Sequence, residues 1–151
     1  MQINSAGATA RMLMTNHGLI KRGWRFEFDY AKCRAGQCNY RKKVISLSKV
    51  ITELATEDQV RDTILHEIAH ALVGPGHGHT HVWKYTARQI GCNGKRCHDH
   101  ATPEGKYLGT CPGCSHEQRK HRRTRVACRM CCNKHNHGRF TEDYLISWRE
   151  V

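Results

Sequence analysis

The first apolar stripe of the chain has the spacing of a helix. Between Thr9 and His17, core-type side chains recur three, four and seven positions apart, and Gly18 follows as a stop signal. The pattern predicts a short amphipathic helix over residues 9–17. One face of this helix is expected to carry Ala10, Leu13, Met14 and His17.

A period of two replaces the helical spacing farther along the chain. Trp24, Phe26 and Phe28 alternate with charged residues, which predicts a half-buried strand over residues 24–29. Residues 31–37 contain a glycine and several charged or amide side chains, so we expect a turn there, and Val44, Ile45 and Leu47 then indicate a second strand. The two strands are expected to pair as an antiparallel hairpin.

Capping signals and apolar spacing predict two further helices. Thr56 and Gln59 form a capping box, two acids follow in the first turn, and Gly74 ends the pattern, so a helix is expected over residues 57–73. Another should run over residues 80–90. The inward positions are Val60, Ile64, Ile68 and Ala71 or Leu72 in the first helix, and Val82, Trp83, Thr86, Ala87 and Ile90 in the second.

The composition leaves room for only a small hydrophobic core. Of the 151 residues, 38% are hydrophobic and 25% are charged, so the nine cysteines and twelve histidines are candidates for an additional source of order. No segment approaches the ~18 consecutive apolar residues that cross a bilayer, and no secretory signal opens the chain. We therefore expect a cytoplasmic protein with no membrane partner, whose cysteines bind zinc rather than form disulfides.

The sequence His66-Glu67-Ile68-Ala69-His70 places two histidines inside the best-supported helix. Four residues advance a helix by slightly more than one turn, so both imidazoles project from one face and can bind one zinc ion. Glu67 then lies at the open side of the metal, where a carboxylate can move a proton from the attacking water to the leaving amine. The motif predicts a catalytic zinc site with His66 and His70 as ligands and Glu67 as the general base; a structural or incidental motif is the alternative.

A catalytic zinc ion usually has three protein ligands, so the site needs one more. The third ligand is expected in the glycine-rich loop before the next helix, where the chain can double back toward the first two. Spacing alone leaves His77, His79 and His81 open as candidates.

The motif and this loop together resemble the SprT-like zinc peptidases. In that family the third ligand precedes an aromatic residue by four positions, which implies His79 here, with Trp83 as the aromatic residue. The resemblance covers about residues 12–140, including the segments 24–29 and 44–48 and a terminal zinc ribbon. The family includes Spartan-type proteases, which digest proteins crosslinked to DNA, and compact bacterial and phage members, which this chain resembles. The resemblance therefore implies a zinc metalloendopeptidase that acts on protein or peptide substrates.

Two C-x-x-C pairs lie in the last third of the chain, Cys111 with Cys114 and Cys128 with Cys131. Four thiolates close a tetrahedral zinc site, so we predict a structural zinc ribbon, for which the free energy of zinc binding is largely the free energy of folding. Cys132 directly follows Cys131, and this doubling leaves the fourth ligand in question.

Positive charge is concentrated in the same part of the chain. The formal net charge is +12, and residues 106–139 contain nine Lys or Arg against one acid. This asymmetry predicts a boundary near residues 103–105, with a zincin-like domain over 1–104 and a basic zinc ribbon with its tail over 105–151. A run of cations between the cysteine pairs is expected to bind DNA phosphates without sequence preference, a solvated charged face being the alternative. The run consists of Arg119, Lys120, Arg122, Arg123 and Arg125.

Together these expectations describe an α+β protein, a small zincin-like domain of helices over a short antiparallel sheet, followed by a zinc ribbon. The expected function is zinc-dependent hydrolysis of peptide bonds in DNA-associated proteins, with one catalytic and one structural zinc ion. The alternative is a non-catalytic nucleic-acid-binding protein with two structural zinc sites. The sequence predicts no oligomeric state.

Four cysteines are expected to be buried thiols or an occasional redox pair rather than a third metal site: Cys33, Cys38, Cys92 and Cys97.

Overall fold

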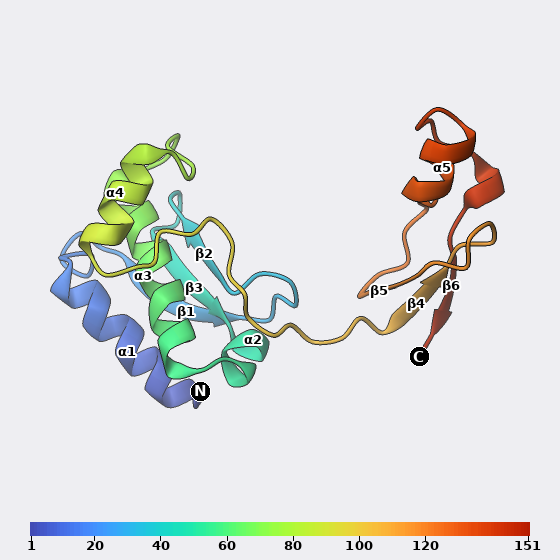
Figure 1. Cartoon of the computed structure of the whole chain (residues 1–151). Coiled ribbons are helices and arrows are strands. Elements are labelled where there is room, and N and C mark those ends of the chain that lie inside the picture. The colour runs from blue at the N-terminus through green and yellow to red at the C-terminus, as the bar shows by residue number, and fades with distance from the viewer. The chain divides into compact units, whose positions relative to one another are not determined.

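The computed structural model describes all 151 residues, which form two compact units, Met1–Pro103 and Glu104–Val151 (Figure 1). The protein has an α+β fold, as predicted. The first unit contains α1 (Ile3–Asn16), β1 (Arg25–Asp29), β2 (Gly36–Asn39), β3 (Val44–Ser48), α2 (Lys49–Leu54), α3 (Glu57–Val73) and α4 (His81–Gln89). The second contains β4 (Tyr107–Thr110), β5 (Glu117–Lys120), α5 (Arg129–His135), a 3-10 turn over Glu142–Tyr144, and β6 (Ser147–Glu150).

The sheet of the first unit has the order β1-β3-β2. The central strand β3 is buried along its whole length and runs parallel to β1, with Ile45 opposite Phe26. The predicted antiparallel hairpin between these two strands is therefore wrong. The hairpin partner of β3 is β2, which the sequence predicts as part of a turn, and its Cys38 lies opposite Ile45. Pairing with a buried neighbour overrides the weak strand preference of glycine and asparagine in β2.

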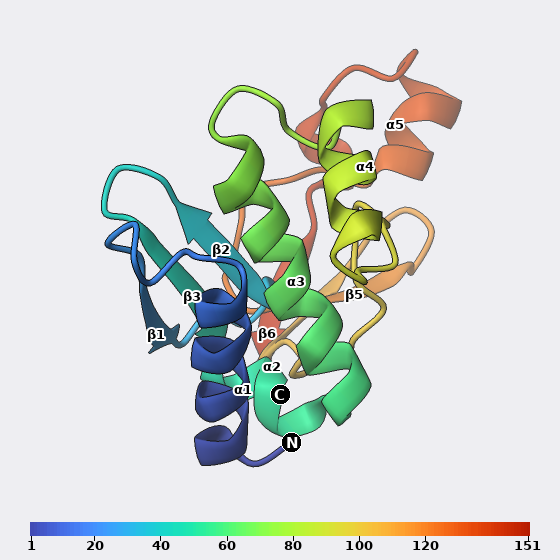
Figure 2. The ribbon, with the colours of Figure 1, turned by 90° about the vertical axis from the view of Figure 1, so that its left-hand side faces the viewer.

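Helices α1 and α3 lie side by side and cover one face of this sheet (Figure 2). The helix α1 begins at Ile3 rather than near Thr9. Its first turns bury Ala6 completely and bring Gly7 close to the sheet, where an added Cβ would meet Phe28 at 3.5 Å. Alanine and glycine do not produce a stripe of large apolar residues in the sequence. The predicted start of α1 near Thr9 is therefore too late.

Helix α3 has the predicted bounds because its caps are local. The Thr56 hydroxyl accepts the Gln59 N–H at 3.2 Å, and the Thr56 N–H donates to the Gln59 side chain at 3.0 Å. Gly74 ends the helix with a φ of +84°. In α4, Trp83 is fully buried as predicted, whereas Val82 is 37% exposed, so its inward assignment is wrong. No helix has both the length and the apolar character needed to cross a membrane.

The second unit is an antiparallel sheet of order β5-β4-β6 with α5 at one end. Its small core consists of Cys111, Cys128, Cys131 and Ile146. An added Cβ at Gly109 would lie 2.6 Å from the Trp148 ring, so a glycine at this point of β4 is what lets the indole cover the strand.

Candidate metal sites and active site

Three histidines converge between α3 and the loop that leads into α4. His66 and His70 project from α3, and Nε2 of His79 lies 3.0 Å from Nε2 of His66 and 3.1 Å from Nε2 of His70. Positive φ angles of +88° at Gly76 and +51° at Gly78 let the loop double back toward α3. Of the three loop histidines that spacing left open, the structure brings His79 to the pair.

The geometry and protonation of this cluster fit a zinc ion. Three nitrogens at roughly 2.0–2.1 Å from a tetrahedral zinc ion lie about 3.3–3.4 Å apart, close to the separations of these rings. Burial, with a contribution from neighbouring imidazoles, lowers the pKa of His66 to about 3 and that of His70 to about 4. Burial and the charge of Arg96 also lower the pKa of His79. All three rings are therefore neutral at pH 7, which is the form that binds metals.

The indole of Trp83 lies behind all three imidazoles. It has no exposed surface, and its ring centroid lies 4.5 Å from that of His66, 5.2 Å from that of His70 and 4.6 Å from that of His79. Aromatic contacts at these distances restrict rotation of the imidazoles. Trp83 therefore holds the three rings toward a common point.

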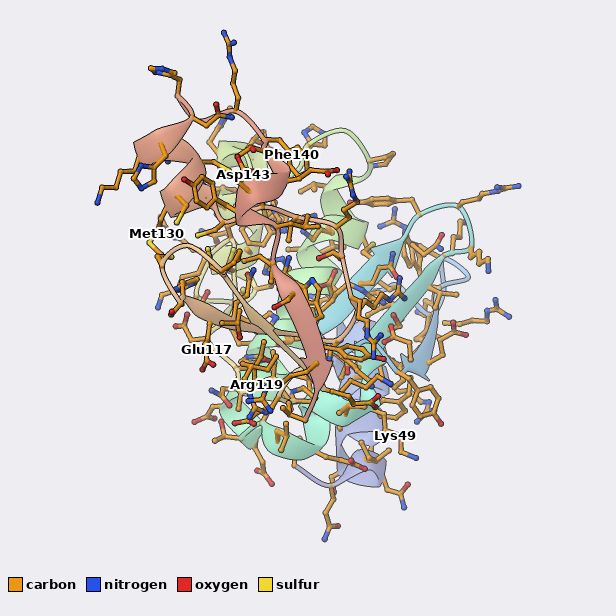
Figure 3. The ribbon with its side chains drawn as sticks, turned by 90° about the vertical axis from the view of Figure 1, so that its right-hand side faces the viewer. Lys49, Glu117, Arg119, Met130, Phe140 and Asp143 are labelled. Carbon is orange, nitrogen blue, oxygen red and sulfur yellow. The ribbon has the colours of Figure 1, made fainter.

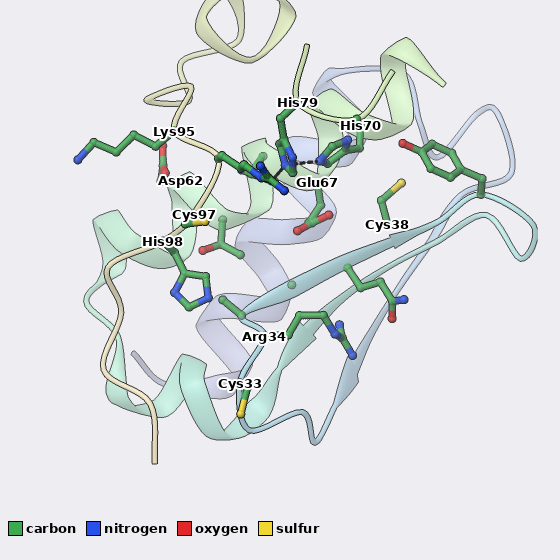
Figure 4. A pocket seen from close by; sticks show the side chains of 18 of the residues that line it. Cys33, Arg34, Cys38, Asp62, Glu67, His70, His79, Lys95, Cys97 and His98 are labelled. Atoms are coloured by element: carbon green, nitrogen blue, oxygen red, sulfur yellow. Dashed lines mark hydrogen bonds between the residues drawn. The ribbon is translucent and has the colours of Figure 1, made fainter. Parts of the chain in front are cut away.

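The carboxyl group of Glu67 lies beside the histidines (Figure 4). Its side chain is only 8% exposed, and a Cβ added at Gly36 of β2 would lie 3.0 Å from its Oε1 atom, so the glycine makes room for the carboxyl group. Burial raises the pKa of Glu67 to about 8, and the positive charge of Arg34 opposes this shift. A zinc ion held by the three histidines would lower this pKa, because a nearby positive charge favours the carboxylate, which is the form that accepts a proton.

A pocket of about 760 Å³ opens over the histidines and Glu67. Its floor is formed by α3 (Figure 4). Residues 33–38, which include most of β2, form one wall, and residues 95–98 form another. Because β2 is an edge strand, its outer backbone N–H and C=O groups have no partner in the sheet.

Neither wall of this pocket was predicted from the sequence. The residues of β2 include glycine and asparagine, which give no strand signal, and residues 95–98 belong to no regular element. Arg34 and Tyr40 also line the pocket, and no motif marks either of them. Only the tertiary structure brings these residues to the metal cluster.

Alanine at His79 is expected to release zinc from this cluster, while alanine at His77 or His81 should leave it bound. His79 is the one loop histidine whose ring nitrogen lies within 4.8 Å of those of both His66 and His70. Zinc per protein chain, measured by atomic emission after dialysis, should fall from two to one in His79→Ala alone. Loss of zinc from His77→Ala, with retention in His79→Ala, would reverse the assignment.

The two C-x-x-C pairs meet in the second unit. The Sγ atoms of Cys111 and Cys131 lie 3.7 Å apart, as do those of Cys114 and Cys128. Sulfurs around a tetrahedral zinc ion lie about 3.8 Å apart, so the cluster fits a closed structural site. The first pair lies in the turn from β4 to β5, and the second begins α5. This arrangement is compatible with the predicted zinc ribbon.

The other five cysteines lie outside both clusters, and all nine are free. Cys132 and Cys92 are buried, and burial raises the pKa of the half-buried Cys38 to about 12. Cys33 and Cys97 are exposed, so the expectation of buried thiols is wrong for these two. The five cysteines form no third metal cluster.

The basic run between the cysteine pairs is partly neutralised by ion pairs. Arg119 lies 2.7 Å from Glu104, and Arg125 pairs with Glu142. Both acids lie outside residues 106–139, the segment in which Lys and Arg outnumber the acids. Figure 3 shows Arg119 on β5, whereas residues 121–125 follow that strand and belong to no helix or strand.

Three cations of the run have no acidic partner within ion-pair distance: Lys120, Arg122 and Arg123. Two of them lie over aromatic rings. The Lys120 ammonium is 5.6 Å from the Trp148 ring centroid, and the Arg123 guanidinium is 4.9 Å from that of Tyr107. These three residues are the part of the run that remains available to an anionic partner.

Two sequence comparisons relate this chain to known proteins. The germ cell nuclear acidic protein of Drosophila melanogaster is 33% identical over 117 residues, which cover 64% of this chain and 11% of that protein. This chain thus corresponds to about a tenth of the relative's length. A model of the SprT-like family matches residues 11–104, a segment that includes the three converging histidines and Glu67. Because the match covers more than half of the chain, this protein belongs to the SprT-like family.

Proposed function

We propose that this protein is a zinc-dependent endopeptidase that hydrolyses peptide bonds in DNA-associated proteins. The observation that carries the proposal is the convergence of His66, His70 and His79 beside the buried carboxyl group of Glu67, on the floor of an open pocket. Membership in a family of metallopeptidase type supports the same reaction class. The decisive experiment is a search for new peptide termini in a disordered protein treated with the zinc-loaded enzyme.

Each residue of the site has a separate role in this mechanism. The three histidines would hold the zinc ion, which when bound polarises a carbonyl group and lowers the pKa of water. Glu67 takes a proton from the attacking water and passes it to the leaving nitrogen. Trp83 fixes the direction of the imidazoles. A purely structural site would need a fourth protein ligand, and the cluster has three.

The edge strand β2 supplies a second element for substrate binding. It lines the pocket along the side of Glu67, and its outer backbone groups can pair with an extended peptide. Such pairing requires a substrate segment without secondary structure of its own. We therefore expect flexible or unfolded segments to be cleaved in preference to folded domains.

The ribbon supplies the proposed contact with DNA. Lys120, Arg122 and Arg123 lack acidic partners, and guanidinium groups match phosphate oxygens. Phosphate contacts give affinity without sequence readout, so the unit would bring the peptidase to DNA rather than to one sequence. The second zinc ion, held by the four cysteines, would fold this unit.

The double substitution Arg122→Ala with Arg123→Ala is expected to weaken DNA binding and reduce its salt dependence. Each lost phosphate contact removes about 0.9 from the slope of log affinity against log salt, so the slope should become shallower by about two at most. The measurement is fluorescence anisotropy of labelled duplexes of unrelated sequence at several salt concentrations. A matched control removes Lys21 and Arg22, two exposed cations of the first unit. An unchanged slope in the ribbon variant would assign these arginines to another role.

A further inference from the structure

One wall of the pocket carries a guanidinium group with an unused donor. Arg34 precedes β2 and lines the pocket, and its Nη2 atom lies 3.0 Å from Oδ2 of Asp29. Its Nη1 atom is buried and has no hydrogen-bond partner. The Arg34 side chain as a whole is 40% exposed, so a ligand oxygen in the pocket can accept from the accessible N–H groups of the guanidinium.

The orientation of Arg34 is set before any ligand binds. Asp29, its ion-pair partner, accepts the Ser46 hydroxyl at 2.7 Å and the Ala31 N–H at 3.0 Å. Asp29 is therefore fixed to the central strand and to the loop that carries Arg34. A donor that is held in place loses little conformational entropy on binding, which favours specific recognition.

The wall formed by residues 95–98 carries a second cation, and this one has no ion-pair partner. Arg96 lines the pocket, is exposed and forms no ion pair. Arg96 lines the same pocket as His66, His70 and His79, so its positive charge faces the space over the metal cluster.

The remaining charged residues of the pocket are already engaged or point elsewhere. Asp62 accepts the Asn93 N–H at 2.7 Å. Lys95 lies 3.5 Å from Asp99, and Figure 4 shows its ammonium group directed away from His79. Apart from Glu67 and Asp62, the charged residues that line the pocket are thus cationic.

We propose that Arg34 and Arg96 form a carboxylate subsite that binds an Asp or Glu side chain of the peptide substrate close to the scissile bond. The proposal rests on the peptidase function and names a preferred substrate class for it. A planar guanidinium group matches a carboxylate in geometry as well as in charge. Both arginines line the one pocket that opens over the histidines, where the proposed peptide substrate would lie.

The test measures peptide binding to a variant in which hydrolysis is expected to be strongly reduced. The zinc-loaded Glu67→Gln variant is titrated against a fluorescent ten-residue neutral peptide and against a set in which one Gln at a time is replaced by Glu. One position, or two neighbouring ones, should tighten binding roughly five- to tenfold. Adding Arg34→Gln or Arg96→Gln should reduce this preference to about twofold or less. Arg34→Lys should give an intermediate preference, because lysine keeps the positive charge but lacks the planar guanidinium group with its paired N–H donors.

Two controls show whether the preference depends on these arginines rather than on the net charge of the protein. Lys84→Gln makes the same change in charge at an exposed position of α4 outside the pocket and should leave the preference intact. Arg96 has no structural partner, so Arg96→Gln tests the proposal even if Arg34→Gln folds poorly. Equal binding of the Gln and Glu peptides, or a preference unchanged in both arginine variants, overturns the subsite.

Two further outcomes have distinct meanings. If the arginine variants lose affinity for a DNA duplex and keep the preference for Glu, the arginines contact phosphate and the subsite is wrong. If the Glu preference is present and depends on both arginines but the wild-type protein cleaves none of the peptides, the subsite stands and the proposed peptidase function fails.

Discussion

Replacing Glu67 by Gln is expected to lower kcat/KM for peptide hydrolysis by a factor of about 100 or more, because a positioned general base contributes roughly that much. Zinc content should not change, since Glu67 is not among the three converging ligands. The amide keeps the size of the side chain in its buried position against Gly36 but cannot accept the proton from water. Steady-state kinetics on a quenched fluorescent peptide, together with zinc analysis of the same sample, measures both expectations.

Glu57→Gln is the matched control for this substitution. Glu57 is an exposed acid in the first turn of the same helix, and it does not line the pocket. Its substitution should leave kcat/KM within about twofold, since a change at an exposed position outside the pocket has a small effect. Hydrolysis that survives in Glu67→Gln would remove Glu67 from the mechanism.

The second large effect is expected in the ribbon. Cys131→Ala should release one zinc ion, and residues 104–151 should then no longer fold as a cooperative unit. The core of this unit consists of three cysteines and Ile146, so little apolar burial remains without the metal. A small unit of this kind depends on zinc for most of its folding free energy. Zinc analysis and hydrogen exchange of the backbone amides in β4 and β6 are the appropriate measurements.

Cys132 provides the control at the next residue. Its thiol is buried to the same degree as that of Cys131, and it lies outside the four-sulfur cluster. Cys132→Ala should therefore keep both zinc ions and most of the exchange protection. If Cys132→Ala loses the metal and Cys131→Ala retains it, the choice of the fourth ligand is wrong.

The predictions from sequence were most accurate where the signal is local. The capping box of Thr56 and Gln59 and the terminating Gly74 act within a few residues, and α3 has the predicted bounds. The relation of His66, Glu67 and His70 follows from helix geometry alone. The two C-x-x-C pairs are also local patterns, and the predicted cluster of their four cysteines is present in the structure.

Features that depend on distant parts of the chain could not be predicted. Strand β2 forms because β3 offers a buried edge, and its own residues are poor strand formers. The partners of Arg119 and Arg125 are Glu104 and Glu142, each fifteen or more residues away, so the charge count of the segment overstated its free charge. Arg34 joins the pocket through Asp29 and the sheet, and no periodicity signals this position.

The most direct test of the central claim is hydrolysis of a disordered protein in water enriched in ¹⁸O, followed by mass spectrometry. The zinc-loaded protein should cut reduced casein at internal bonds, and each new carboxyl terminus should contain ¹⁸O from solvent. The metal-free protein should produce no such termini, and the zinc-loaded Glu67→Gln variant should produce them more slowly by a factor of about 100 or more. Intact casein after treatment with the zinc-loaded protein, or equal cleavage by the Glu67→Gln variant, would contradict the assignment of this site as a zinc peptidase.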